Sequence, residues 1–487
     1  MRSFIKKTLA VLLSAMLLLS AVPITAMAAE TTAQECVGAS SGTTGDCTWT
    51  LDDDGLLTIS GNGAMADYGF CGPWGDKIKN VVIESGVTAI GKEAFSGCTS
   101  LVSVTIGDSV TSIGNFAFRY CTSLVGVTIP DSVTSIGTGA FHGCSRLASV
   151  TISDSVTTID VGAFSGCTSL ESVTIPDSVT SIDYYAFSGC TSLASVTIPD
   201  SVKYIGWSAF SGCTSLASVT IPDSVTTIGG YAFSGCTSLE SVTIGDSVTT
   251  IGNWAFFGCT SLVSVTVDAN NTVYDSRNNC NAVIETGSNT LIAGCKNTVI
   301  PNDVTTVGED AFFGCTSLTS VTIPDSVMTI GNSAFEDCTS LESVTIPDSV
   351  TTIVDYAFSG CTSLASVTIP DSVTSIGFEA FGYLNYDSKA EGFTIYGKPG
   401  SEAEAYANEN GFTFIPCDDY SVTTGDVNGD SKVDITDATL VQQFAAELIE
   451  LDENQKKAAD TNKDGKVDIG DATLIQKFVA ELIRSFD

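Results

Sequence analysis

The sequence predicts a mostly-β solenoid followed by a small all-α module, and two repeat patterns carry that prediction. The pair Ala-Phe recurs every 23 residues over most of the chain, as at Phe187, Phe210 and Phe233. A fixed period of this length is typical of stacked coils that each contact only their neighbours. Near the C-terminus an acidic loop followed by Asp-Ala-Thr-Leu occurs twice, beginning at Asp426 and again at Asp460.

A single coil, from Leu193 to Ser215, illustrates the expected local structure. Val196-Thr197-Ile198 alternates apolar and polar β-branched residues, which predicts a short half-buried strand. Pro199-Asp200 then turns the chain. The stretch Gly206–Cys213 carries its apolar residues at three-to-four spacing, which predicts one short helical turn. No single coil can bury these side chains, so stacking must bury them.

Both ends of the repeat array have the pattern of caps. The segment from Cys47 to Ile59 predicts a hairpin around Asp54-Gly55, with an apolar face made by Trp49, Leu51, Leu57 and Ile59. At the other end Phe393–Tyr396 predicts a strand. Ser401–Asn410 predicts a helix with a capping box between Ser401 and Glu404, and Gly411 ends it.

One interruption breaks the period, because Phe256 and Phe312 are separated by more than two repeat lengths where one is expected. The extra residues predict an irregular coil and a hairpin formed by Ala282–Glu285 and Thr290–Ala293. We expect this hairpin to protrude from the solenoid.

The repeat resembles the 23-residue leucine-rich repeats of bacterial surface antigens. The shared pattern is Cys-x-x-Leu-x-x-Val-x-Ile-Pro-x-x-Val-x-x-Ile-Gly-x-x-Ala-Phe, and it extends from about Val81 to Phe381. The resemblance implies a leucine-rich-repeat solenoid used for adhesion or protein contact. It names no ligand.

The N-terminal segment 1–29 resembles a secretory signal peptide. A basic start at Arg2, Lys6 and Lys7 precedes an apolar stretch from Leu9 to Val22 and the small-x-small pattern Ala26-Met27-Ala28. No later apolar run is long enough to span a bilayer. We therefore expect a secreted, extracellular protein that associates with the cell surface through a partner.

The formal net charge of −36 opposes binding to nucleic acid and to anionic membranes.

The two acidic loops near the C-terminus have the donor spacing of calcium sites. Oxygen donors stand at loop positions 1, 3, 5, 9 and 12, and a backbone carbonyl is available at position 7. Ca²⁺ requires six to eight such oxygens. The sequence therefore predicts two calcium ions, one held by Asp426, Asn428, Asp430, Asp434, Asp437 and the carbonyl of Lys432, and one by Asp460, Asn462, Asp464, Asp468, Asp471 and the carbonyl of Lys466.

These loops resemble a dockerin rather than an EF-hand pair. Position 12 holds Asp437 and Asp471 where an EF-hand holds Glu, no entering helix is expected before Asp426, and each loop is followed by DATL-x-Q-x-F-x-AELI. The resemblance implies calcium-dependent binding to a cohesin of a scaffoldin, in either of two orientations because the halves are nearly alike. One departure is Ser431, which stands where the second loop has Gly465. The implied cohesin-facing residues are Ile435, Thr436, Gln442, Gln443 and Glu447 in the first half and Ile469, Gly470, Gln476, Lys477 and Glu481 in the second.

Two ladders of identical residues have structural interpretations. The cysteines that precede each Leu predict small buried thiols, although adjacent coils would also bring them close enough for disulfides. Cys36 and Cys47 are the better candidates for a disulfide. The aspartates that follow each strand, such as Asp200 and Asp223, predict Asx-turns, with weak cation binding as the alternative.

Variable aromatic residues precede the Ala-Phe pairs and form a candidate ligand stripe. Such rings suit stacking on sugars or binding a protein, and packing between coils is the equal alternative. The threonines expected on the concave face, such as Thr197, are uniform and can hardly specify a ligand. We therefore expect specificity in the insertion hairpin and in the stripe, which comprises Phe116, Tyr184, Tyr185, Trp207, Tyr231, Trp254, Tyr356 and Phe378.

These observations predict a secreted, non-catalytic component of a cellulosome-type complex, whose rod mediates cell adhesion or binds protein or plant polysaccharide. The alternative is a structural or protein-docking rod with no ligand of its own. An enzyme of polysaccharide degradation is the weakest hypothesis, because the one histidine, His142, lies on the variable surface whereas Cys144 belongs to the inward ladder. The expected domains are residues 1–29 (signal peptide), 30–80 (N-terminal β cap), 81–382 (solenoid, with an irregular insertion at about 268–300), 383–418 (C-terminal cap) and 419–487 (dockerin).

Overall fold

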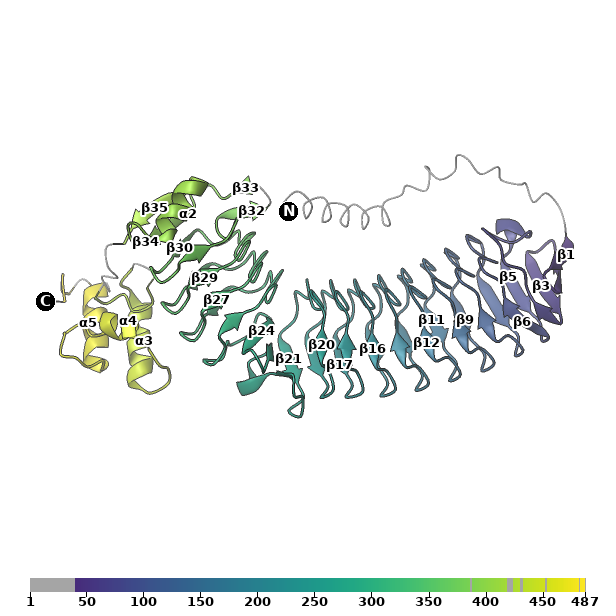
Figure 1. Ribbon diagram of the computed structural model, residues 1–487, viewed down its shortest axis with the longest axis horizontal. Helices are drawn as coiled ribbons and strands as arrows, with labels where there is room; N and C mark the ends of the chain where they lie inside the picture. Colours follow the sequence, from purple (N-terminus) through teal and green to yellow (C-terminus); the bar gives the residue numbers. More distant parts are fainter. Residues whose placement is uncertain are drawn as a thin grey trace. The chain divides into compact units, whose positions relative to one another are not determined.

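The computed structural model describes residues 40–385, 388–417, 424–429, 432–451, 453–480 and 482–486 (Figure 1). The predicted signal peptide and Cys36 lie outside these ranges. Within them, no helix is long and apolar enough to cross a membrane. The chain divides into two compact units, residues 1–179 and 180–487, and each is described by itself.

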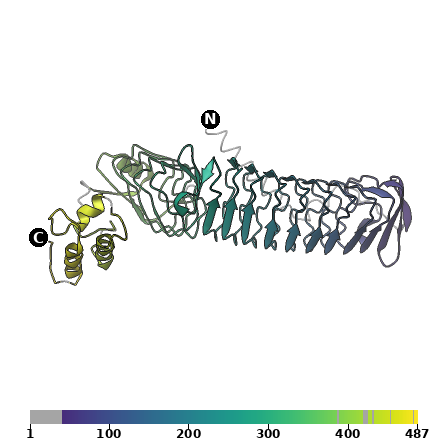
Figure 2. The same ribbon diagram turned by 90° about the horizontal axis from the view of Figure 1, so that it is seen from below.

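The first unit has two strands in most of its coils, a longer one and a shorter one. Figure 2 shows strands of successive coils lying side by side. The longer strands pair in parallel after an antiparallel start, in the order β1 (Ser41–Thr44), β2 (Cys47–Leu51), β3 (Leu56–Gly61), β5 (Asn80–Ile83), β7 (Ser103–Ile106), β9 (Gly126–Thr128), β11 (Ser149–Thr151) and β13 (Ser172–Thr174). The shorter strands pair in a second sheet, which contains β4 (Gly63–Ala64), β6 (Val87–Ile90), β8 (Ser112–Ile113), β10 (Ser135–Ile136) and β12 (Thr158–Ile159).

The phenylalanines of the repeat form a stacked column in the core. Phe95 and Phe118 have ring centroids 5.0 Å apart, and Phe118 and Phe141 are 5.2 Å apart. Trp74, beside the 3₁₀ turn η1 (Gly75–Lys77), stacks on Phe95 at 5.3 Å and meets Trp49 edge-on at 5.9 Å. The predicted N-terminal hairpin is confirmed, and its Trp49 packs on Trp74, which closes the open end of the column.

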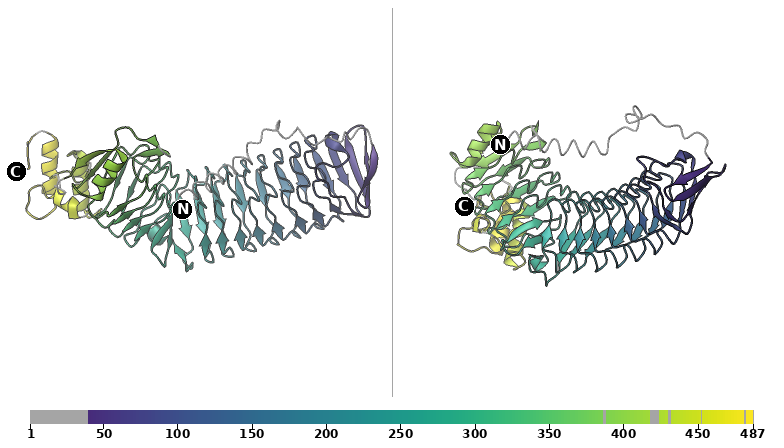
Figure 3. Two further views of the ribbon diagram at one scale, coloured as in Figure 1. Left: turned by 45° about the horizontal axis from the view of Figure 1, so that its top comes forward. Right: turned by 45° about the vertical axis from the view of Figure 1, so that its right-hand side comes forward.

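The second unit, described by itself, contains coils of the same kind. Its shorter strands are β14 (Ser181–Ile182), β16 (Tyr204–Ile205), β18 (Thr227–Ile228), β20 (Thr250–Ile251), β25 (Thr306–Val307), β27 (Thr329–Ile330), β29 (Thr352–Ile353) and β31 (Ser375–Ile376). Its longer strands are β15 (Ser195–Thr197), β17 (Ser218–Ile221), β19 (Ser241–Ile244), β21 (Ser264–Val267), β26 (Ser320–Thr322), β28 (Ser343–Thr345) and β30 (Ser366–Thr368). Within this unit, both views of Figure 3 show successive coils stacked next to one another.

The predicted helical turn in each coil is wrong. Between Gly206 and Cys213 the chain makes consecutive turns, in which the N–H of Ala209 donates to the carbonyl of Gly206 (3.2 Å). Ser208 has φ 53°, a left-handed conformation that no right-handed helix contains. The second strand of this coil, Tyr204–Ile205, was not predicted, because two residues are too few to show an alternating pattern.

The insertion contains the predicted hairpin, but the hairpin does not protrude. β22 (Tyr274–Asp275), η2 (Arg277–Asn279), β23 (Val283–Glu285) and β24 (Thr290–Ala293) occupy this segment, and β23 pairs antiparallel with β24. β24 also pairs in parallel with β25, and Val283, Ile284 and Leu291 are fully buried. The hairpin is therefore part of the sheet and its core rather than an exposed arm.

The repeat cysteines are buried, except for the half-buried Cys315, and most of them donate to backbone carbonyls. The Sγ of Cys121 donates to the carbonyl of Phe95 (3.1 Å), and that of Cys236 donates to Phe210 (3.3 Å). Burial raises the pKa of the Cys236 thiol to about 12. A protonated, buried thiol is a poor nucleophile for disulfide exchange, which favours the thiol interpretation. The sulfurs of Cys71 and Cys98 are in contact at 3.2 Å.

The C-terminal cap comprises β32 (Tyr383–Asn385), β33 (Ser388–Lys389), β34 (Thr394–Gly397), α2 (Glu402–Asn410) and β35 (Thr413–Pro416). Gly411 ends α2 in a left-handed conformation, with φ 70°, as predicted. The capping box is wrong, since the Ser401 hydroxyl makes no cap hydrogen bond. The Glu404 carboxylate instead accepts from the N–H of Gly400 at 2.7 Å.

Candidate metal centres and binding surfaces

The C-terminal module consists of two similar halves around one small core. The helices α3 (Ile435–Ala445) and α5 (Ile469–Val479) each follow one acidic loop, and α4 (Glu453–Ala459) leads into the second loop. Ala438 and Ala472 stand at matching positions of the two helices and are both fully buried, as are Val441 and Ile475. Because the same positions of α3 and α5 are buried, the two helices have the same orientation relative to the acidic loops that precede them.

The carboxylate of Asp437 ties the first loop to α3. Its Oδ1 accepts hydrogen bonds from the N–H groups of Val427 (2.7 Å) and Asn428 (3.0 Å), and its Oδ2 accepts one from Asp434 (2.9 Å). The Asp434 side chain in turn caps the helix by accepting from the N–H of Thr436 at 2.7 Å. Asp437 is fully buried.

The second loop repeats this arrangement. Asp471 is fully buried, its Oδ1 accepts from the N–H groups of Thr461 (2.9 Å) and Asn462 (3.2 Å), and its Oδ2 accepts from Asp468 (2.9 Å). The Asp460 carboxylate accepts from the N–H groups of Asp464 (3.0 Å) and Gly465 (2.9 Å). These bonds fold the loop back on itself and place its oxygen-bearing side chains along one short turn.

The donors of these loops fit a calcium ion in chemistry. They are carboxylate, amide and carbonyl oxygens, the ligands that Ca²⁺ prefers. Each loop also holds a fully buried carboxylate, Asp437 or Asp471, and no described lysine, arginine or histidine forms an ion pair with it. A divalent cation would offset that buried negative charge. The described residues contain no preformed cluster of three or more acidic, histidine or cysteine ligands, and Asp430 and Ser431 lie outside them.

The residues implied to face a cohesin are mostly exposed. Ile435 and Ile469 stand at equivalent helix starts and are 57% and 58% exposed. Thr436, Gly470, Glu447 and Lys477 are also exposed, Gln442, Gln443 and Gln476 are half-buried, and Glu481 lies outside the described residues. Leu448 and Leu482 are another equivalent pair, each 74% exposed, and they were not predicted. The repeated Ala-Glu-Leu-Ile sequence was the signal that could have revealed them.

The residues of the predicted aromatic stripe make ring contacts with their neighbours at several places. Trp207, Tyr231 and Trp254 are in contact, with ring centroids 5.0 and 4.8 Å apart, and Trp254 also meets Phe313 at 6.4 Å. Tyr356 and Phe378 form a second group at 5.7 Å. Tyr184 lies near Tyr204 at 6.3 Å, and Tyr185 is exposed. Phe116 belongs to the first unit, where it lies beside Arg119.

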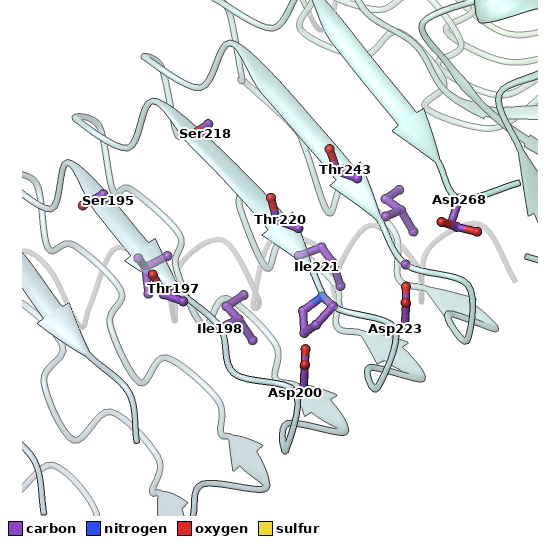
Figure 4. A pocket seen from close by; sticks show the side chains of 14 residues that line it. Ser195, Thr197, Ile198, Asp200, Ser218, Thr220, Ile221, Asp223, Thr243 and Asp268 are labelled. Atoms are coloured by element: carbon purple, nitrogen blue, oxygen red, sulfur yellow. The ribbon is translucent and has the colours of Figure 1, made fainter. Parts of the chain in front are cut away.

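The uniform strand face carries a shallow hollow of about 440 Å³ over β15, β17 and β19 (Figure 4). Hydroxyls of Ser195, Thr197, Ser218, Thr220 and Thr243 line it, together with the carboxylates of Asp200, Asp223 and Asp268. The Asx-turn prediction does not describe Asp223, whose Oδ1 accepts from the N–H of Asp246 in the next coil at 3.1 Å. This aspartate therefore joins neighbouring coils.

His142 and Cys144 are directed to different partners. The Cys144 sulfur is buried and donates to the carbonyl of Phe118 at 3.1 Å. The half-buried His142 ring meets the Tyr120 ring edge-on at 5.2 Å. This pair is therefore not a nucleophile and base joined by a hydrogen bond.

The fold and the two acidic loops define a leucine-rich-repeat solenoid joined to a dockerin. The model of the BspA type leucine rich repeat region matches residues 65–194, 180–286 and 291–391, and that of the dockerin type I domain matches residues 424–480. The chain belongs to the BspA type leucine rich repeat family and carries a type I dockerin. A dockerin implies cellulosome-type docking to a cohesin, type I dockerins bind calcium, and leucine-rich repeats imply a protein-interaction rod.

Solved structures of bacterial leucine-rich-repeat proteins are similar to this chain. One from Bacteroides ovatus is 28% identical over 76% of this chain and 98% of its own, with a TM-score of 0.49. A leucine rich cell surface protein from Faecalibacterium prausnitzii is 28% identical over 76% of this chain and 97% of its own, with a TM-score of 0.43. No curated protein matches the chain.

Proposed function

We propose that this protein is a secreted, non-catalytic component of a cellulosome-type complex, which docks to a scaffoldin cohesin and presents its solenoid as a binding rod. The observation that carries the docking role is the pair of buried carboxylates, Asp437 and Asp471, which organise two equivalent loops in the same way. The formal net charge of −36 suits neither nucleic acid nor anionic lipid as a partner.

Calcium has a structural role in this proposal. The side chains of Asp426, Asn428, Asp430, Asp434 and Asp437, with the Lys432 carbonyl, would hold one ion. Asp460, Asn462, Asp464, Asp468 and Asp471, with the Lys466 carbonyl, would hold the other. Bound calcium supplies positive charge that offsets carboxylate repulsion and fixes each loop against its helix. Asp434 and Asp468 then keep α3 and α5 capped and their exposed faces in position.

The cohesin surface offers a first test, because each half presents an equivalent isoleucine. Replacing Ile435 or Ile469 alone with Ser leaves the other half intact, so we expect less than about a threefold loss of cohesin affinity. Replacing both removes an anchor from either orientation and should weaken binding by at least about 1.4 kcal/mol, or tenfold, by isothermal titration calorimetry with a cohesin in solution.

The same variants must keep their calcium sites for that test to be informative. Both isoleucine side chains are exposed, so helix content and calcium titration should match the wild type. A double variant that binds cohesin like the wild type would exclude this face from the interface.

The rod's ligand surface is proposed to be the group Trp207, Tyr231 and Trp254. Trp207 is 39% exposed, and its ring lies against Gly230, where an added Cβ would approach it to 3.1 Å. Tyr231 and Trp254 have φ values of 55° and 58° at a position that Gly139 and Gly162 occupy in other coils. The fold imposes this conformation in every coil, where residues such as Ser208 and Glu379 also adopt it, so it is the aromatic rings themselves that support a ligand role.

The alternative is that the rod has no ligand and only spaces or docks other components. The contacts among these rings favour it, since each ring already uses part of its surface on its neighbour. Glycan-array and culture-supernatant binding by the full chain would separate the two functions. Reproducible capture of a glycan or protein that depends on the aromatic group supports the ligand-binding rod.

Substitutions in this group give a quantitative prediction. Trp207→Ala or Trp254→Ala should each weaken a captured ligand by roughly 1–3 kcal/mol without unfolding the rod, because aromatic anchors commonly dominate binding energy. Thr197→Ala, in the hydroxyl-lined hollow, should change affinity by less than about 0.5 kcal/mol. If the threonine variant loses binding while the tryptophan variants retain it, the site is the hollow of Figure 4.

A further inference from the structure

Beyond Lys92, the basic side chains of the first unit all lie in two adjacent coils. Between Lys92 and Lys203 the only lysine, arginine or histidine residues are Arg119, His142 and Arg146. Arg119 and His142 stand at equivalent positions of adjacent coils, and Arg146 follows His142 in the same turn segment. The next coil has Ser165 and Ser169 at these positions, so two arginines and a histidine replace the usual serine. Burial, and then the charge of Arg119, lower the pKa of His142 and favour its neutral form.

Arg119 is held between aromatic rings. Its guanidinium carbon lies 4.6 Å from the centroid of the Tyr120 ring and 5.4 Å from that of Phe116. Tyr120 also meets His142 at 5.2 Å, and its backbone N–H donates to the His142 carbonyl at 2.7 Å. These contacts restrict the Arg119 side chain before any ligand arrives, which lowers the entropic cost of binding.

Arg119 makes no ion pair with a described carboxylate. Its Nε atom is buried without a hydrogen-bond partner, and no described carboxylate lies within 4.0 Å of it. Arg277 in the second unit shows the contrast, since it pairs with Asp275 and Asp303, both at 2.7 Å. In a chain with a net charge of −36, an arginine without an acidic neighbour is poised for an external anion.

The site is maintained against the preferences of the backbone. Tyr120 has φ 58° at a position where the next two coils have Gly143 and Gly166, both with φ 72°. The Tyr120 ring also depends on Gly143, because a Cβ there would lie 2.3 Å from the ring. The Phe116 ring likewise depends on Gly139, where a Cβ would lie 2.5 Å from the ring. Strain of this kind is typical of functional sites.

We propose that Arg119, Tyr120, His142 and Arg146 form a binding site for the carboxylate of an acidic sugar chain, a polyuronate. A guanidinium matches a carboxylate in planar geometry and in charge, and His142 and Arg146 supply further donors. The neighbouring turn residues Thr122 and Ser145 carry hydroxyls that can exchange hydrogen bonds with a hydroxyl-rich sugar. This surrounding favours an acidic glycan over an acidic peptide. The proposal rests on the rod being a ligand-binding part.

The test uses the full chain with calcium present and three probes: an oligogalacturonate, its methyl ester of the same length, and poly-glutamate. The wild type should bind the oligogalacturonate at least tenfold more tightly than the ester or the polypeptide. The triple variant Arg119→Ser, Tyr120→Gly and His142→Ser restores the Ser-Gly sequence of the next coil. It should lose at least tenfold in affinity while its melting temperature stays equal or rises, since glycine accepts the left-handed backbone.

Arg119→Gln is a second variant that keeps both rings and should show the same selective loss. Equal binding of acid and ester, or unchanged affinity in both variants, overturns the site. Tighter binding of poly-glutamate overturns the glycan and assigns an acidic peptide instead. If only this anion site is wrong, cohesin capture and the Trp207-dependent ligand are unaffected. If the rod is not a ligand-binding part at all, no surface of the rod captures a ligand.

Discussion

Chelation of calcium should abolish capture of this protein by a cohesin. Without the ion, the carboxylates of Asp460, Asp464 and Asp468 repel one another within one short loop. The hydrogen bonds that Asp471 accepts then no longer offset the burial of its charge. We expect the apparent affinity in excess EDTA to fall by at least about 4 kcal/mol, roughly a thousandfold, measured by surface capture with and without added Ca²⁺.

Two substitutions provide a matched comparison for the chelation experiment. Asp471→Ala removes a proposed ligand and a buried acceptor of backbone N–H groups, so calcium should no longer restore full binding. Thr473→Ala removes only an exposed hydroxyl that donates to the Ile469 carbonyl at 2.8 Å, so added calcium should restore its cohesin binding after chelation, as in the wild type. Cohesin binding that persists unchanged in EDTA would rule out the proposed calcium-dependent docking.

The solenoid could be predicted from sequence because its information is repeated. Each coil carries the same Val-x-Ile strand and Ala-Phe core, so the period reveals which residues share a position, and the N-terminal hairpin follows from local alternation. The left-handed backbone conformation at the position before each Ala cannot be predicted in this way, since Tyr231 and Trp254 occupy that position as well as Gly139. That conformation is imposed by hydrogen bonds between coils, such as Tyr231 N–H to the Asn253 carbonyl (3.0 Å).

The binding surfaces were less predictable, because they too depend on contacts between separate segments that the sequence pattern does not show. The spacing of oxygen donors anticipates the two loops, but the role of Asp437 as acceptor of three backbone N–H groups depends on how the loop closes. The insertion hairpin was expected to protrude because its sequence departs from the period. Its Val283, Ile284 and Leu291 are nevertheless apolar enough to continue the core, and burial of apolar area decides the outcome.

Removal of one core ring should cost the solenoid a large part of its local stability. The fully buried Phe210 ring stacks on Phe187 and on Phe233, with centroids 5.4 Å from each. Phe210→Ala leaves a cavity between two coils that cannot collapse without breaking their parallel pairing, and it should cost about 3–5 kcal/mol. Guanidinium-induced unfolding followed by circular dichroism, in excess calcium, measures this loss.

Two further phenylalanines make the prediction specific to burial rather than to position along the chain. Phe256 borders the insertion and is half-buried, so Phe256→Ala should cost only roughly 1–2 kcal/mol. Phe381 lies at the end of the repeats, yet it is fully buried, stacks on Phe358 at 4.8 Å, and its N–H donates to the Tyr406 hydroxyl at 2.9 Å. Because the cap covers this ring, Phe381→Ala should cost nearly as much as Phe210→Ala. If Phe256→Ala lowers the free energy of unfolding as much as Phe210→Ala does, stability in this unit does not depend on how deeply each phenylalanine is buried.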